Sequence, residues 1–74
     1  MRWSVKYVYV IEKAKDGSYS AYVPDLPGCT TSADTADDVR RNIKDAVDSY
    51  IESLREHNET IPAATSTTDV VEAA

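Results

Sequence analysis

The sequence predicts an α+β fold in two layers, with an antiparallel three-stranded sheet packed on one long helix. Apolar and polar residues alternate near the start of the chain, as they do in strands. After residue 35 the apolar residues recur about every 3.6 residues, as they do on one face of a helix. Turn-forming residues gather between these regions, at 22–35, with two of the three prolines and one of the two glycines. We therefore expect the order β-β-β-α, followed by either a short last strand or a frayed tail.

The first two strands are expected to form an antiparallel hairpin. Residues 3–12 alternate and are rich in the β-branched and aromatic types that strands favour. Asp16-Gly17 is a turn signal, and a second alternating run follows over residues 18–23. Pro24 ends this second strand because it has no N–H to donate to a neighbouring strand.

The stretch that follows is expected to turn the chain twice. Pro24, Pro27 and Gly28 would fix its backbone, and Gly28 is free to adopt a positive φ. A short third strand is predicted over residues 29–33. Cys29, the only cysteine, is expected to be a small buried thiol, because no base or cation that would activate it is evident.

Asp34 and Thr35 lead into the predicted helix, which runs from about residue 36 to about residue 57. Thr35 is a good N-cap, and Asp38 three residues later completes a pair that resembles a capping box. The predicted apolar stripe of the helix comprises Val39, Ile43, Ala46, Val47, Tyr50, Ile51 and Leu54.

Length and composition indicate one small domain over residues 1–62, with residues 63–74 as its tail or short last strand. The chain has 74 residues, and its net charge of −5 argues against direct binding of nucleic acid, which needs a basic surface. The start of the sequence lacks the apolar stretch of a signal peptide, and no apolar run approaches the ~20 residues that span a bilayer. We expect a cytoplasmic protein that makes no membrane contact.

Both faces of the predicted first strand carry large apolar side chains. Tyr7, Tyr9 and Ile11 lie on one face, while Val8 and Val10 lie on the other. One helix covers only one face of a sheet, so the second set would be exposed to water. Exposed apolar surface usually marks an interface, and we therefore expect a homodimer or a higher homo-oligomer.

The titratable residues give no pattern of a catalytic, cofactor-binding or metal-binding site. His57, the only histidine, lies near the predicted helix end and has no nucleophile beside it in the sequence. Four acids at positions 25, 34, 37 and 38 suggest the carboxylate cluster of a two-metal nuclease. Helix initiation explains the last three of them, so we expect no enzyme activity, no metal and no cofactor.

Tyr7, Tyr9, Tyr19 and Tyr22 lie on the two hairpin strands. Cross-strand packing is one interpretation, and a protein interface is another, because tyrosine is enriched at interfaces. Base stacking on RNA is a third, which the negative net charge disfavours.

The run Gly17-Ser-Tyr-Ser-Ala-Tyr-Val-Pro-Asp-Leu-Pro-Gly-Cys-Thr-Thr, followed by Ala33-Asp-Thr and an acidic helix start, resembles the HicB antitoxin family. Tyr50-Ile-Glu-Ser-Leu and Ile61-Pro62 also fit that pattern, so the resemblance covers most of the chain. It implies a partial RNase H-like fold of order β-β-β-α-β that has lost the RNase H catalytic carboxylates. It also implies binding to a HicA-type toxin, a small basic ribonuclease that cleaves mRNA, by covering its catalytic histidine and RNA surface.

The chain departs from many members of that family at its end. Those members continue into a DNA-binding domain, whereas few residues follow Pro62 here, and they include Asp69 and Glu72 but no Lys or Arg. We therefore expect no DNA binding, and no repression of its own operon, by this chain alone.

Tyr22, Asp25 and Leu26 are the residues expected to contact the toxin, because they surround the Pro-Asp-Leu-Pro-Gly turn. The alternative is that they only hold the connection between strand and helix. Two other functions stay open: a stand-alone module that binds another protein or a small ligand, and a residual nuclease.

Overall fold

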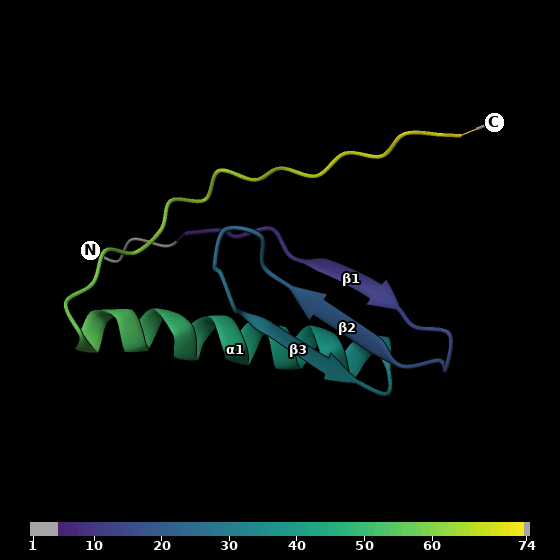
Figure 1. Cartoon of the computed structure of the whole chain (residues 1–74), viewed down its shortest axis with the longest axis horizontal. Helices are drawn as coiled ribbons and strands as arrows, with labels where there is room; N and C mark the ends of the chain where they lie inside the picture. The colour runs from purple at the N-terminus through teal and green to yellow at the C-terminus, as the bar shows by residue number, and fades with distance from the viewer. Residues whose placement is uncertain (1–4, 74) are drawn as a thin grey trace.

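The computed structural model describes residues 5–73, which form a three-stranded sheet with one helix against one of its faces (Figure 1). Strand β1 spans Val10–Lys13, β2 spans Tyr19–Tyr22 and β3 spans Thr30–Ala33, and helix α1 spans Ala36–Glu56. This architecture confirms the predicted α+β class and the order β-β-β-α.

The sheet is antiparallel throughout, and β2 lies in its middle. Ala21 of β2 is opposite Ile11 of β1 and Thr31 of β3. Side chains alternate along a strand, so these three residues lie on the same face of the sheet. Ala21 is fully buried and Ile11 packs against the core, which identifies this face as the one that α1 covers.

Strand β1 is shorter than the alternation predicted. The prediction was residues 3–12, of which 3 and 4 lie outside the described residues, and regular pairing begins only at Val10. The physical reason lies in β2, whose last paired residue is Tyr22, opposite Val10. Pro24 follows shortly after and offers no N–H, so residues 5–9 run extended without a strand beside them on that side.

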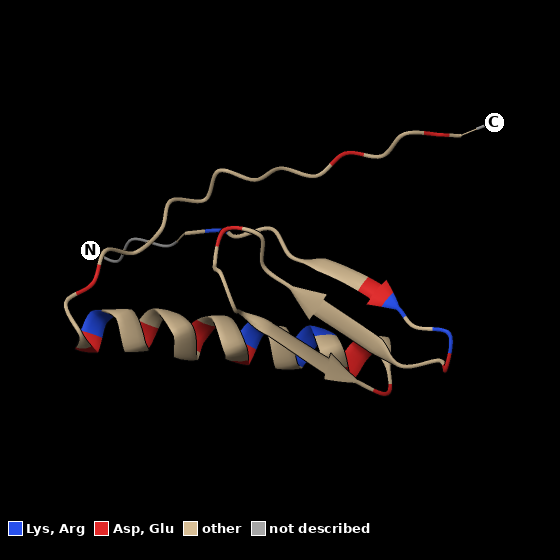
Figure 2. Cartoon of the chain, in the orientation of Figure 1, with Lys and Arg blue, Asp and Glu red and all other residues tan. Residues whose placement is uncertain are grey.

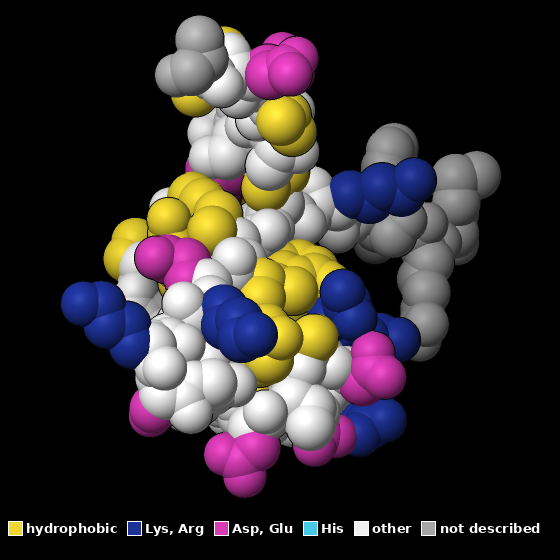
Figure 3. Space-filling model, turned by 90° about the vertical axis from the view of Figure 1, so that its right-hand side faces the viewer, with side chains coloured by type: hydrophobic (Ala, Val, Ile, Leu, Met, Phe, Trp, Pro, Cys, Tyr) yellow, Lys and Arg dark blue, Asp and Glu magenta, His cyan; other side chains and the backbone are white. Residues whose placement is uncertain are grey.

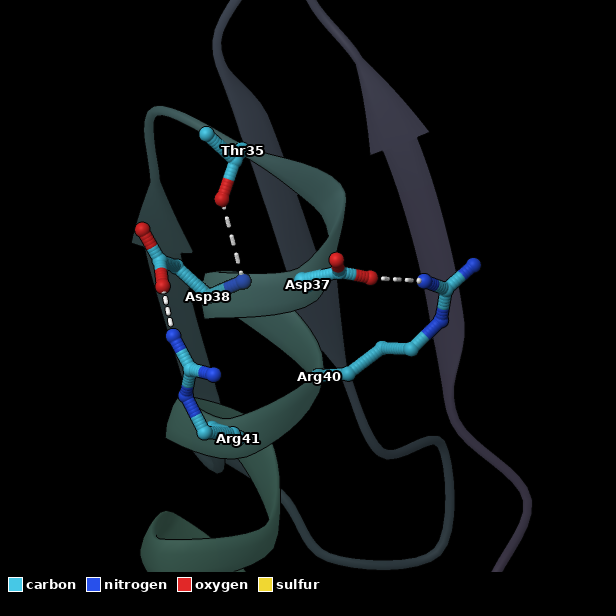
Figure 4. A network of polar contacts seen from close by, with 5 residues as sticks. All are labelled: Thr35, Asp37, Asp38, Arg40 and Arg41. Carbon is cyan, nitrogen blue, oxygen red and sulfur yellow. Dashed lines mark hydrogen bonds and ion pairs between the residues drawn. The ribbon is translucent and has the colours of Figure 1, made fainter.

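Helix α1 begins as predicted. The Thr35 side chain accepts a hydrogen bond from the Asp38 backbone N–H at 3.1 Å, which satisfies one free donor of the first turn (Figure 4). Asp37 pairs with Arg40 at 3.0 Å, and Asp38 pairs with Arg41. All four side chains are largely exposed, so these ion pairs add little stability.

The core is small and lies between α1, β2 and the connection that precedes β3. Its fully or nearly fully buried members come from all three: Ala21, Val23, Leu26, Cys29, Val39 and Ile43. The predicted helix stripe packs against this cluster, although Leu54 is only half-buried and lies outside it. A core of this size is typical of a domain that gains stability from a partner.

The chain continues from α1 as an extended segment without regular structure. His57 ends the helix, and Asn58 adopts a left-handed φ of 55° that reverses the chain direction. A last strand over residues 67–72 was one of two expectations for the tail, the other being a frayed end. Among the described residues, 67–72 form no strand. The segment instead passes residues 5–9 and then projects away from the body (Figure 1). Within the described residues, α1 is not apolar enough to cross a membrane.

Candidate interaction surface

The Pro-Asp-Leu-Pro-Gly turn forms a compact loop over residues 23–29. The Val23 backbone N–H donates to the Cys29 carbonyl at 3.1 Å, which closes the loop at its base. Inside it, Leu26 N–H donates to the Val23 carbonyl and Cys29 N–H donates to the Leu26 carbonyl. Gly28 has a φ of +81°, as expected for the turn. The loop is therefore held by its own backbone and by its buried side chains.

Leu26 points inward from this loop and has no accessible surface. Cys29 is also buried, and burial raises the pKa of its thiol. A thiol with a raised pKa is a poor nucleophile, and this agrees with the structural role expected for Cys29. The structure places Leu26 beneath the surface of the loop.

Asp25 points outward from the same loop and binds the C-terminal segment. Its Oδ2 accepts hydrogen bonds from the backbone N–H groups of Thr65 and Ser66, both at 2.9 Å. Its Oδ1 accepts from the hydroxyl groups of the same two residues, also at 2.9 Å. We call this arrangement the Asp25 anchor. One carboxylate thereby fixes two residues that lie about forty positions later in the chain.

The anchor changes the acid–base behaviour of its surroundings. The Ser66 backbone N–H, helped by the Ser66 hydroxyl and the Thr65 donors, lowers the pKa of Asp25, because these bonds favour the charged carboxylate. Burial and the nearby Asp25 charge raise the pKa of Tyr7. Tyr7 donates its hydroxyl to the Pro62 carbonyl, so it is a second contact between the body and the C-terminal segment.

The face of the sheet away from α1 carries the third candidate, Tyr22, whose residue is 41% exposed. Tyr22 is opposite Val10 on β1, and alternation places Val8 on the same face. Val8 and Val10 are half-buried, and neither packs against the core. Together these three residues form a partly exposed apolar patch, which we call the outer patch.

A groove lies on the opposite side of residues 5–9, against α1. It consists of two adjoining hollows of about 440 and 250 Å³, both lined by Val5, Tyr7 and Val47. Its rim is charged, with Arg40 and Lys44 near one end and Arg55 near the other.

Acidic and basic residues both occur along the length of α1 (Figure 2). From the hairpin end, apolar side chains are visible between Lys and Arg side chains (Figure 3). Lys13 lies 5.8 Å from the centre of the Tyr19 ring. Acidic and basic residues are therefore intermixed in both figures, and neither sign dominates the surface in these two views.

The His, Cys, Asp and Glu residues are dispersed in the described part of the chain. No group of three or more His, Cys, Asp or Glu side chains there is placed to hold a metal ion. The His57 ring Nδ1 lies 2.8 Å from the Ser53 carbonyl, so this histidine takes part in the end of the helix. Asp37 and Asp38 serve helix initiation, as expected, and Asp25 lies apart from them in the anchor.

The fold and this set of surfaces define a small α+β domain that presents binding surfaces. The sequence matches the family model described as the HicB-like antitoxin of bacterial toxin–antitoxin systems over residues 7–74. The chain belongs to this HicB-like antitoxin family.

Relatives of unassigned activity agree with that placement. The chain is 50% identical over 58 residues to a UPF0150 protein of Thermoplasma acidophilum, which covers 78% of this chain and 84% of that one. It is 44% identical over 48 residues to a UPF0150 protein of Archaeoglobus fulgidus, and this alignment covers 65% of this chain and 70% of the relative. A UPF0150 protein of Synechocystis is 39% identical over 56 residues, and this alignment covers 76% of this chain and 71% of the relative.

The Asp25 anchor is the feature that the sequence did not indicate. Thr65 and Ser66 lie in a small polar stretch that is typical of a connector. Nothing in their local pattern points to a distant carboxylate. The one available signal was Asp25 itself, a carboxylate without a neighbouring base or helix start to explain it.

Proposed function

We propose that this chain is an antitoxin that binds and sterically neutralises a HicA-type toxin, a small basic ribonuclease that cleaves mRNA. The observation that carries the proposal is the family match, which spans residues 7–74. The net charge of −5 supports it, because an acidic protein associates readily with a basic one and disfavours direct contact with RNA. The chain would act by occlusion, without enzyme activity of its own and without a cofactor.

Within this proposal the outer patch contacts the toxin, and the loop at residues 23–29 supports the surface beside it. Tyr22 is exposed, lies beside the half-buried Val8 and Val10 and is of a type that often dominates binding energy, so it is the proposed direct contact. Leu26 shapes the loop from beneath. Asp25 acts by holding residues 65–66, which makes the C-terminal segment part of the same domain.

The proposal includes a homodimer, because the outer patch leaves Tyr22 41% exposed and Val8 and Val10 only half-buried in the single chain. A dimer brings two copies of each surface to the toxin.

The test uses a HicA-type toxin, purified with its catalytic histidine replaced so that it is not toxic. Calorimetry with the wild-type chain is compared with Tyr22→Glu and with the matched control Ser20→Glu, which lies on the same face at an exposed position. We expect tight binding by the wild type, at least tenfold weaker binding by Tyr22→Glu and little change in Ser20→Glu. Equal affinity of all three would remove Tyr22 from the interface, and no binding by the wild type would favour a stand-alone module.

A further inference from the structure

Strand β3 lies at an edge of the sheet. It pairs with β2 on one side, and no described residue pairs with it on the other side. Residues of an antiparallel strand alternately direct their N–H and C=O groups to one side and to the other, so part of the β3 backbone faces outward without a partner strand. Unpaired groups of this kind are a template for a strand of another chain.

The two edges of the sheet differ in their protection. Natural proteins block an edge with charged side chains, above all lysine, or with proline. Strand β1 carries Glu12 and Lys13, and Lys6 precedes it. Strand β3 has the sequence Thr-Thr-Ser-Ala, without a charge or a proline. Both strands have four residues, so the difference lies in their side chains and leaves β3 as the unprotected edge.

The C-terminal segment of the chain lies away from this edge. The Asp25 anchor holds it at residues 65–66, and it then passes residues 5–9, which lead into β1 (Figure 1). Among the described residues, the chain's own C-terminal segment therefore leaves the outer side of β3 uncovered.

Charge favours one kind of strand at this edge. Asp34 directly follows β3 and is exposed, and no described residue forms an ion pair with it. Asp37 and Asp38 follow in the first turn of α1, where they pair with arginines of the next turn (Figure 4). A second copy of β3 would bring the same uncompensated aspartate, so like charge disfavours pairing of β3 with itself. A basic strand is favoured instead.

The β3 edge is continuous with the direct contact of the proposed function. Thr30 of β3 is opposite Tyr22 of β2, so both side chains lie on the sheet face away from α1. Both residues are exposed. A strand added along β3 would lie next to Thr30 and two strand spacings, roughly 10 Å, from Tyr22. One partner therefore reaches the edge and Tyr22 together.

We propose that a basic, extended strand of the HicA-type toxin adds to the β3 edge and continues the sheet. The proposal rests on the proposed function and specifies where and how the toxin binds. Main-chain hydrogen bonds along β3 hold the added strand, while Tyr22 contacts the part of the toxin that lies over the outer face.

Amide exchange in the full-length chain tests the strand addition directly. The probe is a HicA-type toxin with its catalytic histidine replaced, and ¹H–¹⁵N spectra follow exchange with and without a saturating amount of it. We expect the β3 amides that face away from β2 to exchange about tenfold more slowly in the complex, because the added strand accepts their hydrogen bonds. The β1 amides that face away from β2 should keep their rates. Binding with unchanged exchange in β3 would overturn the strand addition and leave the proposed function standing, whereas no binding at all would overturn both.

Charge at one position of the edge gives a second test. Ser32 of β3 and Ser20 of β2 are opposite each other, on the same face, and both are exposed. In calorimetry, Ser32→Lys should weaken toxin binding about tenfold because it sets a like charge beside the basic strand, whereas Ser32→Glu should bind at least as tightly as the wild type. The matched control Ser20→Lys should change the affinity little, and circular dichroism verifies that each variant is folded. Equal weakening by Ser32→Lys and Ser20→Lys, or by Ser32→Lys and Ser32→Glu, would overturn the addition of a basic strand at β3.

Discussion

The loop at residues 23–29 and the C-terminal arm at residues 67–73 contrast strongly. The loop is closed by its own backbone bonds and places Leu26 and Cys29 in the core. The arm carries two valines that are almost fully exposed. Asp25 connects the two regions, because it belongs to the loop and holds the residues from which the arm departs. The difference indicates that the loop contributes to the stability of the single chain, whereas the two valines of the arm contribute little to it.

The largest effect is expected from shortening the loop's buried side chain. Leu26→Ala removes a fully buried group and leaves a cavity, which costs about 2–4 kcal/mol of unfolding free energy. A small domain tolerates such a loss poorly, so we expect partial unfolding at room temperature. Urea titration followed by circular dichroism measures it, and a change below about 1 kcal/mol would show that Leu26 does not support the core.

The next effect concerns the connection between the two regions. Asp25→Ala removes both acceptor oxygens and with them all four hydrogen bonds of the Asp25 anchor, so the amides of Thr65 and Ser66 should exchange with solvent about tenfold faster. Amides in β2 should keep their protection, because the core is unchanged. Tyr7→Phe is the matched control, since it removes the bond to Pro62 but not the carboxylate. Unchanged exchange at residues 65–66 in Asp25→Ala would contradict the anchor.

Acid should release the same connection reversibly. The pKa of Asp25 is lowered in the folded chain, so the stabilisation it provides is complete above the ordinary Asp pKa of about 4. It is lost as the pH falls through the lowered value. The amide shifts of Thr65 and Ser66 in ¹H–¹⁵N spectra should therefore titrate below pH 4 and stay constant from pH 5 to 7. Asp16 also has a lowered pKa but bonds only Ser18, so Asp25→Asn should abolish the change at residues 65–66 alone.

The smallest effect on the single chain is expected from the arm itself. Val71→Ala alters a residue that is 90% exposed, so the unfolding free energy of the monomer should change by less than about 0.5 kcal/mol. Urea titration measures this free energy, at a protein concentration below the dissociation constant of the proposed dimer. A loss of unfolding free energy comparable to that of Leu26→Ala would mean that the arm packs on its own chain. The arm would then not differ from the loop in its contribution to stability.

Local signals in the sequence predicted most of the fold. Asp16-Gly17 and Pro24 placed the hairpin, and Thr35 with Asp38 placed the helix start, because each acts through neighbours within a few residues. The predicted length of β1 was wrong, since strand length depends on the partner strand as well as on the alternating pattern. The predicted alternation was real, but Pro24 limits how much of it can pair.

The candidate site was less accessible to sequence reasoning. Asp25 was singled out, and the open alternatives were a partner contact or a role in the turn. The structure shows a contact that neither alternative included, because the Asp25 carboxylate binds Thr65 and Ser66 across a separation of about forty residues. Such a contact is determined by how the whole chain packs and leaves no periodic signal. Tyr22 was chosen because it lies next to the Pro-Asp-Leu-Pro-Gly turn, and it is 41% exposed on the sheet face away from α1.

Inhibition of RNA cleavage tests the central claim most directly. A purified HicA-type ribonuclease is incubated with mRNA and increasing amounts of the purified full-length chain. We expect cleavage to stop when the chain reaches a fixed stoichiometric ratio to the ribonuclease, and we expect the chain alone to cleave nothing. Undiminished cleavage at a large excess of folded chain would contradict the assignment of this protein as the antitoxin of that ribonuclease.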